Sequence, residues 1–271
     1  MTGRLEGRVA IVTAAGAGIG LACATRYASE GASVVVNAFH AESAEAAAAT
    51  IRQHGGVALA LSGDVSDPRV TRALVDRAVS EFGRLDVLHN NAATPHSALI
   101  TEMSDADWRG VLSVTLDSVF YGMRAALPVM IGQGSGSIIS TTSSSGLGGA
   151  ARFGAYGAAK AAVENLTRVA AVENARHGVR VNTICPGTVE SRAAGAWLDS
   201  LPGGRRSYEA QIPQRRVGLA EEVANVAVFL ASDEASYVNG ATFVVDGGVA
   251  ARIALPLNLA SLGLLPSASD T

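Results

Sequence analysis

Residues 9–20, with the sequence VAIVTAAGAGIG, decide the fold of this 271-residue chain. A short apolar run, Val9–Thr13, leads into a turn with Gly16, Gly18 and Gly20, and a helix-forming segment follows. Glycines at such a turn let the backbone approach a pyrophosphate, and the start of a helix presents free N–H groups and a positive partial charge. The stretch therefore predicts a strand, a phosphate-binding turn and a helix.

The same stretch also resembles a secretory signal peptide. Arg8 precedes the apolar run, and Ala22-Cys23-Ala24 resembles a cleavage site. Cleavage would remove the glycine-rich turn, so we favour the strand–turn–helix interpretation and expect a cytoplasmic protein. No run of 18 uninterrupted apolar residues occurs, and we expect no membrane span.

Short apolar runs alternate with longer helix-forming segments along the chain. Continuous apolar runs are typical of strands covered on both faces. The predicted strands are Val9–Thr13, Val34–Asn37, Val57–Ser62, Val87–Asn90, Gly136–Thr141, Val179–Cys185 and Thr242–Asp246. The predicted helices are Gly18–Ser29, Ala44–His54, Pro68–Phe82, Asp105–Ile131, Ala155–Arg176 and Glu221–Ala231. The alternation predicts an α/β protein with a single doubly wound, Rossmann-type parallel sheet of about seven strands and helices on both faces.

We expect residues 1–250 to form one dinucleotide-binding and catalytic domain. Asp67 is a plausible N-cap for the helix that starts at Pro68, and Pro128 is expected to end or kink the long fourth helix. The segment Gly187–Pro213 has no clean period, and a lid or substrate loop would fit there. The tail 251–271 is apolar and then Ser/Pro-rich; it is either partly disordered or packed on a partner subunit.

Composition and charge exclude several functional classes. The formal net charge of −3 provides no basic footprint for nucleic acid or anionic lipid, and 48% hydrophobic residues argue against disorder. The two cysteines, Cys23 and Cys185, are far apart and form no CxxC pair. His89 and His96 lack any carboxylate or cysteine grouping at metal-ligand spacing, so we expect neither a disulfide scaffold nor a metal.

The window that selects between the two nicotinamide cofactors contains no carboxylate. An acid about 20 residues after the turn holds the ribose in NAD-binding proteins, but this chain has Ala38-Phe39-His40 there. A missing carboxylate permits a 2′-phosphate, beside which His40 could gain charge, and Asn37 and Ser43 could donate hydrogen bonds. No Arg or Lys occurs in the window. We favour NADP(H) over NAD(H) and keep both.

Tyr156 and Lys160 are four residues apart in a helical stretch and share one face. A nearby ammonium favours a phenolate and is expected to lower the pKa of Tyr156 from its ordinary value of about 10. The Ser143 hydroxyl, just past a predicted strand, can hold a carbonyl or alcohol oxygen beside the phenol. Together the three form a proton-transfer site for carbonyl/alcohol interconversion, with hydride exchanged with a nicotinamide.

These features occur in an order that resembles the short-chain dehydrogenase/reductase family in its compact single-domain form, from about Gly7 to Gly248. The matching motifs are Gly16/Gly18/Gly20, Asp64-Val65, Asn90-Asn91-Ala92, Ser143, Tyr156/Lys160, Pro186-Gly187 and Asp246-Gly247-Gly248. The Ser-to-Tyr spacing of 13, from 156 − 143, is similar to the spacing usual in the family.

The resemblance implies a role for each matching residue. Tyr156 would be the acid/base, Ser143 would orient the substrate oxygen, and Lys160 would bind the nicotinamide ribose and lower the pKa of Tyr156. Asp64 with Val65 would contact the adenine, although Asp64 alone also suits a turn. With the turn and the adenosine window, the expected cofactor-binding set is Ala14, Gly16, Gly18, Ile19, Gly20, Asn37, His40, Asp64, Val65, Asn90, Ala92, Tyr156, Lys160, Pro186, Gly187 and Val189.

The sequence departs from the family pattern at four positions. Ala14 and Ala93 replace glycines, and Ser191 replaces a threonine but keeps the hydroxyl. Thr115 stands where the family carries a fourth catalytic residue, an Asn that supports a water partly through its backbone carbonyl. A carbonyl survives substitution, so we expect activity to persist, with slower proton delivery as the cost.

The leading hypothesis is an oxidoreductase that transfers hydride between a nicotinamide cofactor and a carbonyl or secondary alcohol. The rival is a catalytically impaired NAD(P)-binding regulatory or scaffolding protein, and a third is a related enzyme for dehydration or epimerisation. The segments 94–100, 146–153 and 187–213 would set the substrate, which their apolar residues suggest is partly apolar. The long helices suit burial in a homo-oligomer, a dimer or tetramer.

Overall fold

The computed structural model describes residues 3–252, apart from the side chains of Arg192 and Ala193. Seven parallel strands form one sheet in the order β3-β2-β1-β4-β5-β6-β7. The strands are β1 (Val9–Val12), β2 (Ser33–Ala38), β3 (Val57–Ser62), β4 (Val87–Asn90), β5 (Gly136–Thr141), β6 (Val179–Pro186) and β7 (Thr242–Val245). The predicted parallel α/β sheet is confirmed. Of the tail 251–271, the part from residue 253 onward lies outside the described residues.

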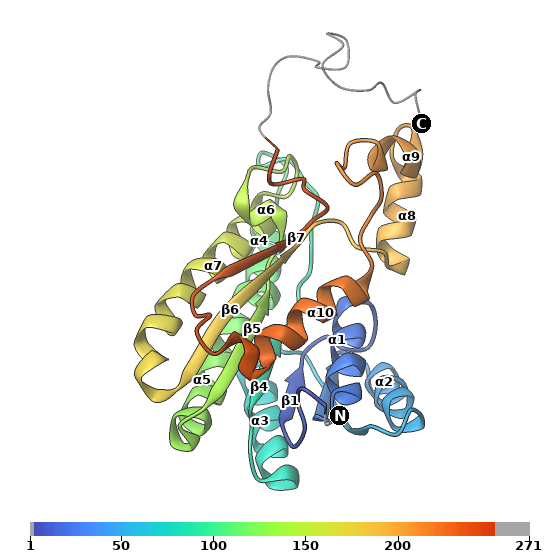
Figure 1. Cartoon of the computed structure of the whole chain (residues 1–271). Coiled ribbons are helices and arrows are strands. Elements are labelled where there is room, and N and C mark those ends of the chain that lie inside the picture. Colours follow the sequence, from blue (N-terminus) through green and yellow to red (C-terminus); the bar gives the residue numbers. More distant parts are fainter. Residues whose placement is uncertain (1–2, 253–271) are drawn as a thin grey trace.

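Helices cover both faces of the sheet, so the core has two apolar layers (Figure 1). One layer lies under α1 (Gly18–Ser29), α2 (Ala41–Gln53) and α10 (Ala220–Ala231). The other lies under α3 (Pro68–Phe82), α5 (Ser118–Gln133) and α7 (Gly154–Asn174). Strand order reverses between β1 and β4, and ligands of such sheets bind outside the carboxyl ends of the strands at that reversal.

Local sequence explains where α3 begins and ends. The Asp67 side chain accepts the Arg69 N–H at 2.9 Å, and Pro68 occupies the first turn, where a missing N–H costs nothing. Gly83 ends the helix with φ +77°, a left-handed conformation that glycine adopts without strain. The predicted capping of this helix is confirmed.

The long fourth helix differs from the expectation. It runs as α4 (Asp105–Leu112), a π-helical turn (Ser113–Asp117) and α5, so the irregularity lies at Thr115, not at Pro128. Pro128 lies inside α5 and does not end it. Among residues 3–252, the stretch Asp105–Gln133 is the one helix long and apolar enough to cross a membrane, but it packs against α3, β4 and β5. Core helices of that length and composition are common.

The segment Gly187–Pro213 was expected to be irregular, but it contains two short helices. They are α8 (Arg192–Ser200), capped by the Ser191 hydroxyl, and α9 (Gly204–Glu209). A Pro-Gly-Gly turn separates them, and neither is long enough to show a helical period in the sequence. The remaining short elements are α6 (Ser144–Leu147) and two 3₁₀ turns, Ala175–His177 and Asp233–Ala235.

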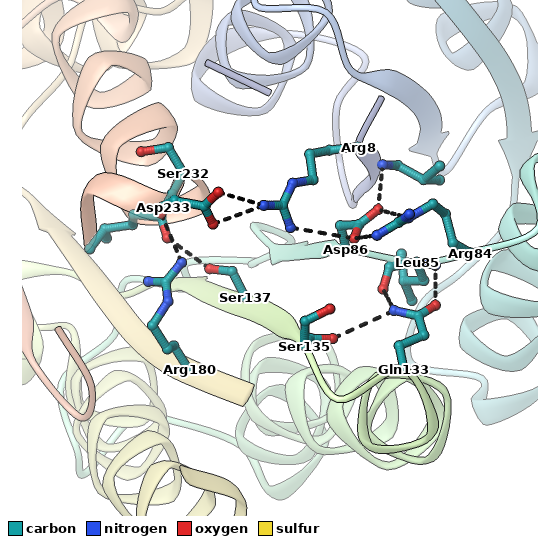
Figure 2. A network of polar contacts seen from close by, with 12 residues as sticks. Arg8, Arg84, Leu85, Asp86, Gln133, Ser135, Ser137, Arg180, Ser232 and Asp233 are labelled. Carbon is teal, nitrogen blue, oxygen red and sulfur yellow. Dashed lines mark hydrogen bonds and ion pairs between the residues drawn. The ribbon is translucent and has the colours of Figure 1, made fainter. Parts of the chain in front are cut away.

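A polar network joins the amino ends of the strands, opposite the expected ligand crevice (Figure 2). At its centre is Asp86, whose side chain is 1% exposed. The carboxylate accepts the Val9 N–H at 2.9 Å and two bonds from Arg84 at 2.7 Å. Arg8 lies 3.6 Å from Asp86 and donates to Asp233 at 2.8 Å. The network ties β1, the start of β4 and the turn after α10 together.

Asp86→Ala is expected to lower the free energy of unfolding by about 3 kcal/mol, because removing the carboxylate leaves the buried Val9 N–H and the Arg84 guanidinium without their acceptor. Asp233→Ala is the matched control, since it contacts the same Arg8 from a side chain that is 87% exposed. We expect it to cost less than about 1 kcal/mol. Urea unfolding at neutral pH measures both, and equal costs would contradict a special role for Asp86.

Candidate active site

The glycine-rich turn follows β1 at the carboxyl edge of the sheet. A side chain at Gly20 would place its Cβ 2.4 Å from the Ala14 carbonyl oxygen and 2.6 Å from the Asn91 amide nitrogen, so only glycine fits. Gly18 has φ +56° where α1 begins. Ala14 has φ +49°, so it holds the left-handed conformation of the glycine usual there, at an order of 1 kcal/mol of backbone strain.

Two helix N-termini converge beside this turn. A Cβ at Gly18 would lie 4.0 Å from the Ser191 Cβ, so the start of α8 faces the start of α1. The N-cap of α1 is Ala17, whose side chain makes no cap hydrogen bond. Free N–H groups and two positive helix ends suit a pyrophosphate, so these residues fit a dinucleotide cofactor.

The residues expected to bind the adenosine of the cofactor begin where β2 ends. The side chain of Phe39 is 65% exposed, and its ring meets the His40 ring edge to face with centroids 5.0 Å apart. Asn37 is buried, and its amide donates to Leu61 O at 3.1 Å and Gly63 O at 3.3 Å. The expectation that Asn37 donates to a phosphate is therefore corrected, because β3 and the turn after it already use both donors.

Asp64 and Val65 lie where β3 ends, beside the residues expected to bind the adenosine. Asp64 Oδ1 accepts the Ser66 N–H at 2.9 Å, so this carboxylate also serves its own turn. Val65 is buried, and its side chain packs into the layer under α3 and α5. Asp64 thus has the turn role that the sequence left open, and the adenine contact of both residues stays a prediction.

Residues after β4 form the floor between the turn and the catalytic helix. Ala92 is buried, and its N–H donates to Thr13 Oγ1 at 3.1 Å. Asn90 is 4% exposed, and its side-chain nitrogen has no hydrogen-bond partner among the described residues. A Cβ on Gly122 would lie 2.5 Å from Asn90 Oδ1, so α5 presses against the other end of the amide.

The structure brings the three predicted catalytic side chains together on α7 and at the start of α6. Lys160 is buried, its Nζ donates to the Thr141 carbonyl at 2.6 Å, and it lies 5.6 Å from the centroid of the Tyr156 ring. Ser143 is the N-cap of α6, where its Oγ accepts the Ser145 N–H at 3.2 Å, and it lies close enough to Tyr156 to lower the pKa of the phenol in part. Lys160 is the only lysine in the chain.

Burial dominates the electrostatics of this pair. It raises the pKa of Tyr156, and the hydrogen bond to Ser143 opposes the rise in part. The expected lowering of the pKa of Tyr156 is therefore wrong for this geometry, because burial raises it. Burial also lowers the pKa of Lys160 from 10.5 to about 7, so the amine is only partly charged at neutral pH.

A buried hydrogen-bonded line connects the turn to the catalytic helix, and the sequence reasoning missed it. His89 Nδ1 lies 3.0 Å from Tyr27 Oη, and its Nε2 lies 3.0 Å from Thr141 Oγ1. Thr141 Oγ1 in turn donates to Asn91 Oδ1 at 3.2 Å, and the Asn91 amide donates to Thr13 O. Burial lowers the pKa of His89 to about 3, so the ring is neutral and donates from Nε2 to Thr141.

Thr115 lies inside the π-helical turn and is fully buried. Its Oγ1 accepts the Thr94 N–H at 3.2 Å, which fixes the loop between β4 and α4. π turns inside α-helices occur frequently at functional sites. Thr115 therefore shapes the wall of the site through its hydroxyl.

The end of β6 supplies the last predicted cofactor contacts. Gly187 packs against Asp246, since a Cβ there would lie 2.9 Å from the Asp246 Cβ. Val189 is buried and bridges Gly218. A cavity of 680 Å³ opens next to this strand end, between Thr188, Leu147 and the segment after β7. None of the three catalytic side chains lines that cavity.

No cluster of three or more His, Cys, Asp or Glu side chains within residues 3–252 has the arrangement of a metal site. Cys23 and Cys185 are buried free thiols, and burial raises the pKa of both, that of Cys185 to about 11.

The fold and the site define a nicotinamide-dependent oxidoreductase that acts on CH–OH groups. A family model described as enoyl-(acyl carrier protein) reductase matches residues 13–250. The chain belongs to the short-chain dehydrogenase/reductase family.

Named relatives span nearly the whole chain. Meso-2,3-butanediol dehydrogenase of Serratia marcescens is 38% identical over 253 residues, 93% of this chain and 98% of that protein. Cis-4-hydroxycyclohexanecarboxylate dehydrogenase of Sinomonas cyclohexanicum is 43% identical, covering 90% of this chain and 97% of the relative. Cyclohexanol dehydrogenase of an Acinetobacter species is 37% identical, covering 93% and 98%. All three are dehydrogenases, and nothing in the comparisons favours a catalytically impaired protein.

Solved structures are also similar. Gluconate 5-dehydrogenase from Burkholderia cenocepacia, in complex with NADP and tartrate, superposes with a TM-score of 0.87 at 33% identity and covers 92% of this chain and 98% of that one. A 7α-hydroxysteroid dehydrogenase complexed with NADH superposes with a TM-score of 0.86 at 35% identity, covering 90% and 95%. Both nicotinamide cofactors thus occur among the neighbours.

Because Lys160 is the only lysine, its titration can be followed directly. In protein labelled with ¹³C-lysine, the single Cε signal is expected to shift with a midpoint near pH 7 in place of 10.5. Lys160→Met is the control and should remove the signal. A midpoint near pH 10 would contradict the burial of the amine.

The same lowered pKa gives stability a defined pH dependence. Between about pH 7 and 10.5 the unfolded chain binds more protons at Lys160 than the folded one, so the free energy of unfolding rises with pH there. This group contributes at most about 1.4 kcal/mol per pH unit. Lys160→Met should lack this part of the rise, which urea unfolding of both proteins at pH 7, 8 and 9 measures.

Proposed function

We propose that this protein is an NADP(H)-preferring dehydrogenase of secondary alcohols carried on a six-membered carbon ring. The observation that carries the proposal is the meeting of Tyr156, Ser143 and Lys160 beside two converging helix N-termini. Two of the three named relatives act, by name, on a hydroxylated cyclohexane, and one of these has the highest identity of the three. The apolar side chains around the site support a ring substrate.

In this proposal the bound nicotinamide supplies the hydride-accepting and hydride-donating carbon. Ser143 holds the substrate oxygen, and Tyr156 Oη takes the alcohol proton on oxidation and returns it on reduction. Lys160, fixed by the Thr141 carbonyl, stands behind the phenol and stabilises its anion when charged. Because its pKa is raised, Tyr156 is protonated at neutral pH, which is the form that donates on reduction.

Tyr156→Phe is expected to lower kcat for cyclohexanol oxidation by about 10²- to 10⁴-fold, because proton transfer by a positioned acid/base is worth that much. The phenyl ring preserves packing, so the dissociation constant of the cofactor, measured by fluorescence, should change less than about threefold. A variant that keeps full turnover would refute the mechanism. Tyr237→Phe, the same change at a fully exposed tyrosine, is the control.

The preference for NADP(H) rests on the absent carboxylate after β2. Ala38 ends β2, and its Cβ would lie 3.1 Å from a Cβ on Gly16, so this side chain faces the phosphate-binding turn. A carboxylate there would accept a bond from a ribose hydroxyl and repel a 2′-phosphate. His40, which is exposed after β2, is the group that we propose meets that phosphate.

Ala38→Asp should reverse the cofactor preference. We expect kcat/KM to be higher with NADP⁺ for the parent, and the ratio of kcat/KM values for NADP⁺ over NAD⁺ to fall at least about tenfold in the variant, equivalent to 1.4 kcal/mol. Glu42→Gln, at the nearest native carboxylate, should leave the ratio within about twofold. A parent enzyme that prefers NAD⁺ would overturn this part of the proposal.

We also propose that the protein is cytoplasmic and assembles as a homodimer or homotetramer. Large apolar side chains exposed on α5 and α7, among them Phe120, Val169 and Val172, support burial against a second copy. Sedimentation at micromolar concentration measures this, and a monomer would contradict it.

A further inference from the structure

Two loops beside Tyr156 are fastened to each other. The Ala98 N–H donates to the Arg152 carbonyl at 3.0 Å, and Ala98 and Phe153 form an isolated parallel bridge. The Arg152 Nε donates to Ser97 Oγ at 3.3 Å, and its guanidinium lies 3.8 Å from Glu102. We call residues 97–102 together with 152–153 the clasp. It joins segments 55 positions apart in the chain into one wall of the site.

The clasp holds a strained residue. Arg152 has φ +70°, in the left-handed region, which costs a non-glycine residue on the order of 1–2 kcal/mol. Such strain persists only where neighbouring contacts fix the backbone, and it occurs often at ligand sites. Here the strained residue sets the direction in which the next side chain, Phe153, leaves the loop.

Phe153 lies directly against the catalytic tyrosine. Its ring meets the Tyr156 ring edge to face, with centroids 6.3 Å apart and planes at 63°. α7 starts at the carboxyl edge of the sheet, where the ligand crevice opens. Phe153 is the N-cap of α7, so it lies three positions before Tyr156 at the end of the helix that meets this edge.

The surroundings of Phe153 are apolar. A Cβ on Gly154 would lie 3.4 Å from Ile100 Cγ1, so Ile100 covers the start of α7. Ile100 and Leu99 are both exposed, and Leu147 is exposed on α6. The charged members of the clasp, Arg152 and Glu102, face each other. The wall beside Tyr156 thus offers carbon surface to a ligand.

We propose that Phe153 is a specificity-determining residue, whose ring, fixed by the clasp, packs on the carbon ring of the substrate while Tyr156 holds its hydroxyl. This inference rests on the proposed function. A six-membered ring places several methylene groups beside the carbinol carbon, and their burial against Phe153 favours binding. A short acyclic diol has less apolar surface to bury there, so it gains less from the same wall.

The test compares cyclohexanol with meso-2,3-butanediol as substrates of the full chain. Phe153→Ala should lower kcat/KM for cyclohexanol at least about tenfold, in the range that loss of apolar pocket contacts produces, and that for butanediol less than about threefold. Phe153→Leu should keep most of the cyclohexanol activity. Tyr237→Ala, an aromatic truncation at a fully exposed side chain in the segment before β7, is the control and should change neither. Cofactor dissociation constants and Tm report on folding.

Arg152→Gly provides a second arm, because glycine keeps the left-handed conformation and removes the guanidinium contacts. It should raise KM for cyclohexanol about two- to fivefold, as loss of an exposed ion pair does, with kcat nearly unchanged.

Two results for Phe153→Ala overturn the inference alone. These are an equal fall with both alcohols, which would make Phe153 part of the proton-transfer environment only, and no fall with either. A parent protein that does not oxidise cyclohexanol overturns the proposed function and this inference with it.

Discussion

The hydrogen bonds of Thr141 hold the site together. Its carbonyl accepts the Lys160 amine, and its hydroxyl lies between His89 and Asn91. Asn91 in turn reaches the backbone of the turn after β1. One residue at the end of β5 thereby sets the distance between the place for the cofactor phosphates and the catalytic amine. Because His89 stays neutral, the line keeps one hydrogen-bond direction across the working pH range.

Burial explains both the rigidity and the reactivity of the site. The Lys160 amine lies where water cannot solvate a full charge, and its carbonyl partner replaces only part of that solvation. Burial also removes solvation from the phenolate of Tyr156 and so raises its pKa, and Ser143 offsets part of this rise. A tyrosine and a lysine one turn apart therefore do not act here as a permanent ion pair. Burial moves the proton affinities of the two groups apart, because it raises the pKa of Tyr156 and lowers that of Lys160 to about 7. At neutral pH the phenol therefore keeps its proton, while the amine is only partly charged.

Much of the fold follows from local patterns, and the exceptions have physical causes. Strands such as β1 and β5 are covered on both faces, so their continuous apolar runs were visible in the sequence. The helices α8 and α9 depend on tertiary contacts, because a helix of six to nine residues has little stability alone. The π turn around Thr115 has no sequence signature that we know; it follows from packing.

Some features of the site could likewise be predicted from the sequence, and others could not. Motif order identified Ser143, Tyr156 and Lys160, which the structure brings together. The donors of Asn37 and the direction of the Tyr156 pKa depend on neighbours from other strands and on burial, which no motif contains. His89 was set aside because it lacked metal-ligand spacing. A buried histidine in the strand next to the turn, with threonines nearby, was the signal for its structural role.

The presence of a single lysine decides how this protein can be labelled or immobilised. Every other cationic side chain in the 271 residues is an arginine or a histidine, so the only side-chain amine of the sequence sits at the catalytic centre. Biotinylation, fluorophore attachment or resin coupling through lysine therefore has no surface anchor among the described side chains. Carboxyl-directed chemistry is the appropriate route for immobilising this protein, and any acylation found at its lysine is a direct readout of access to the catalytic chamber.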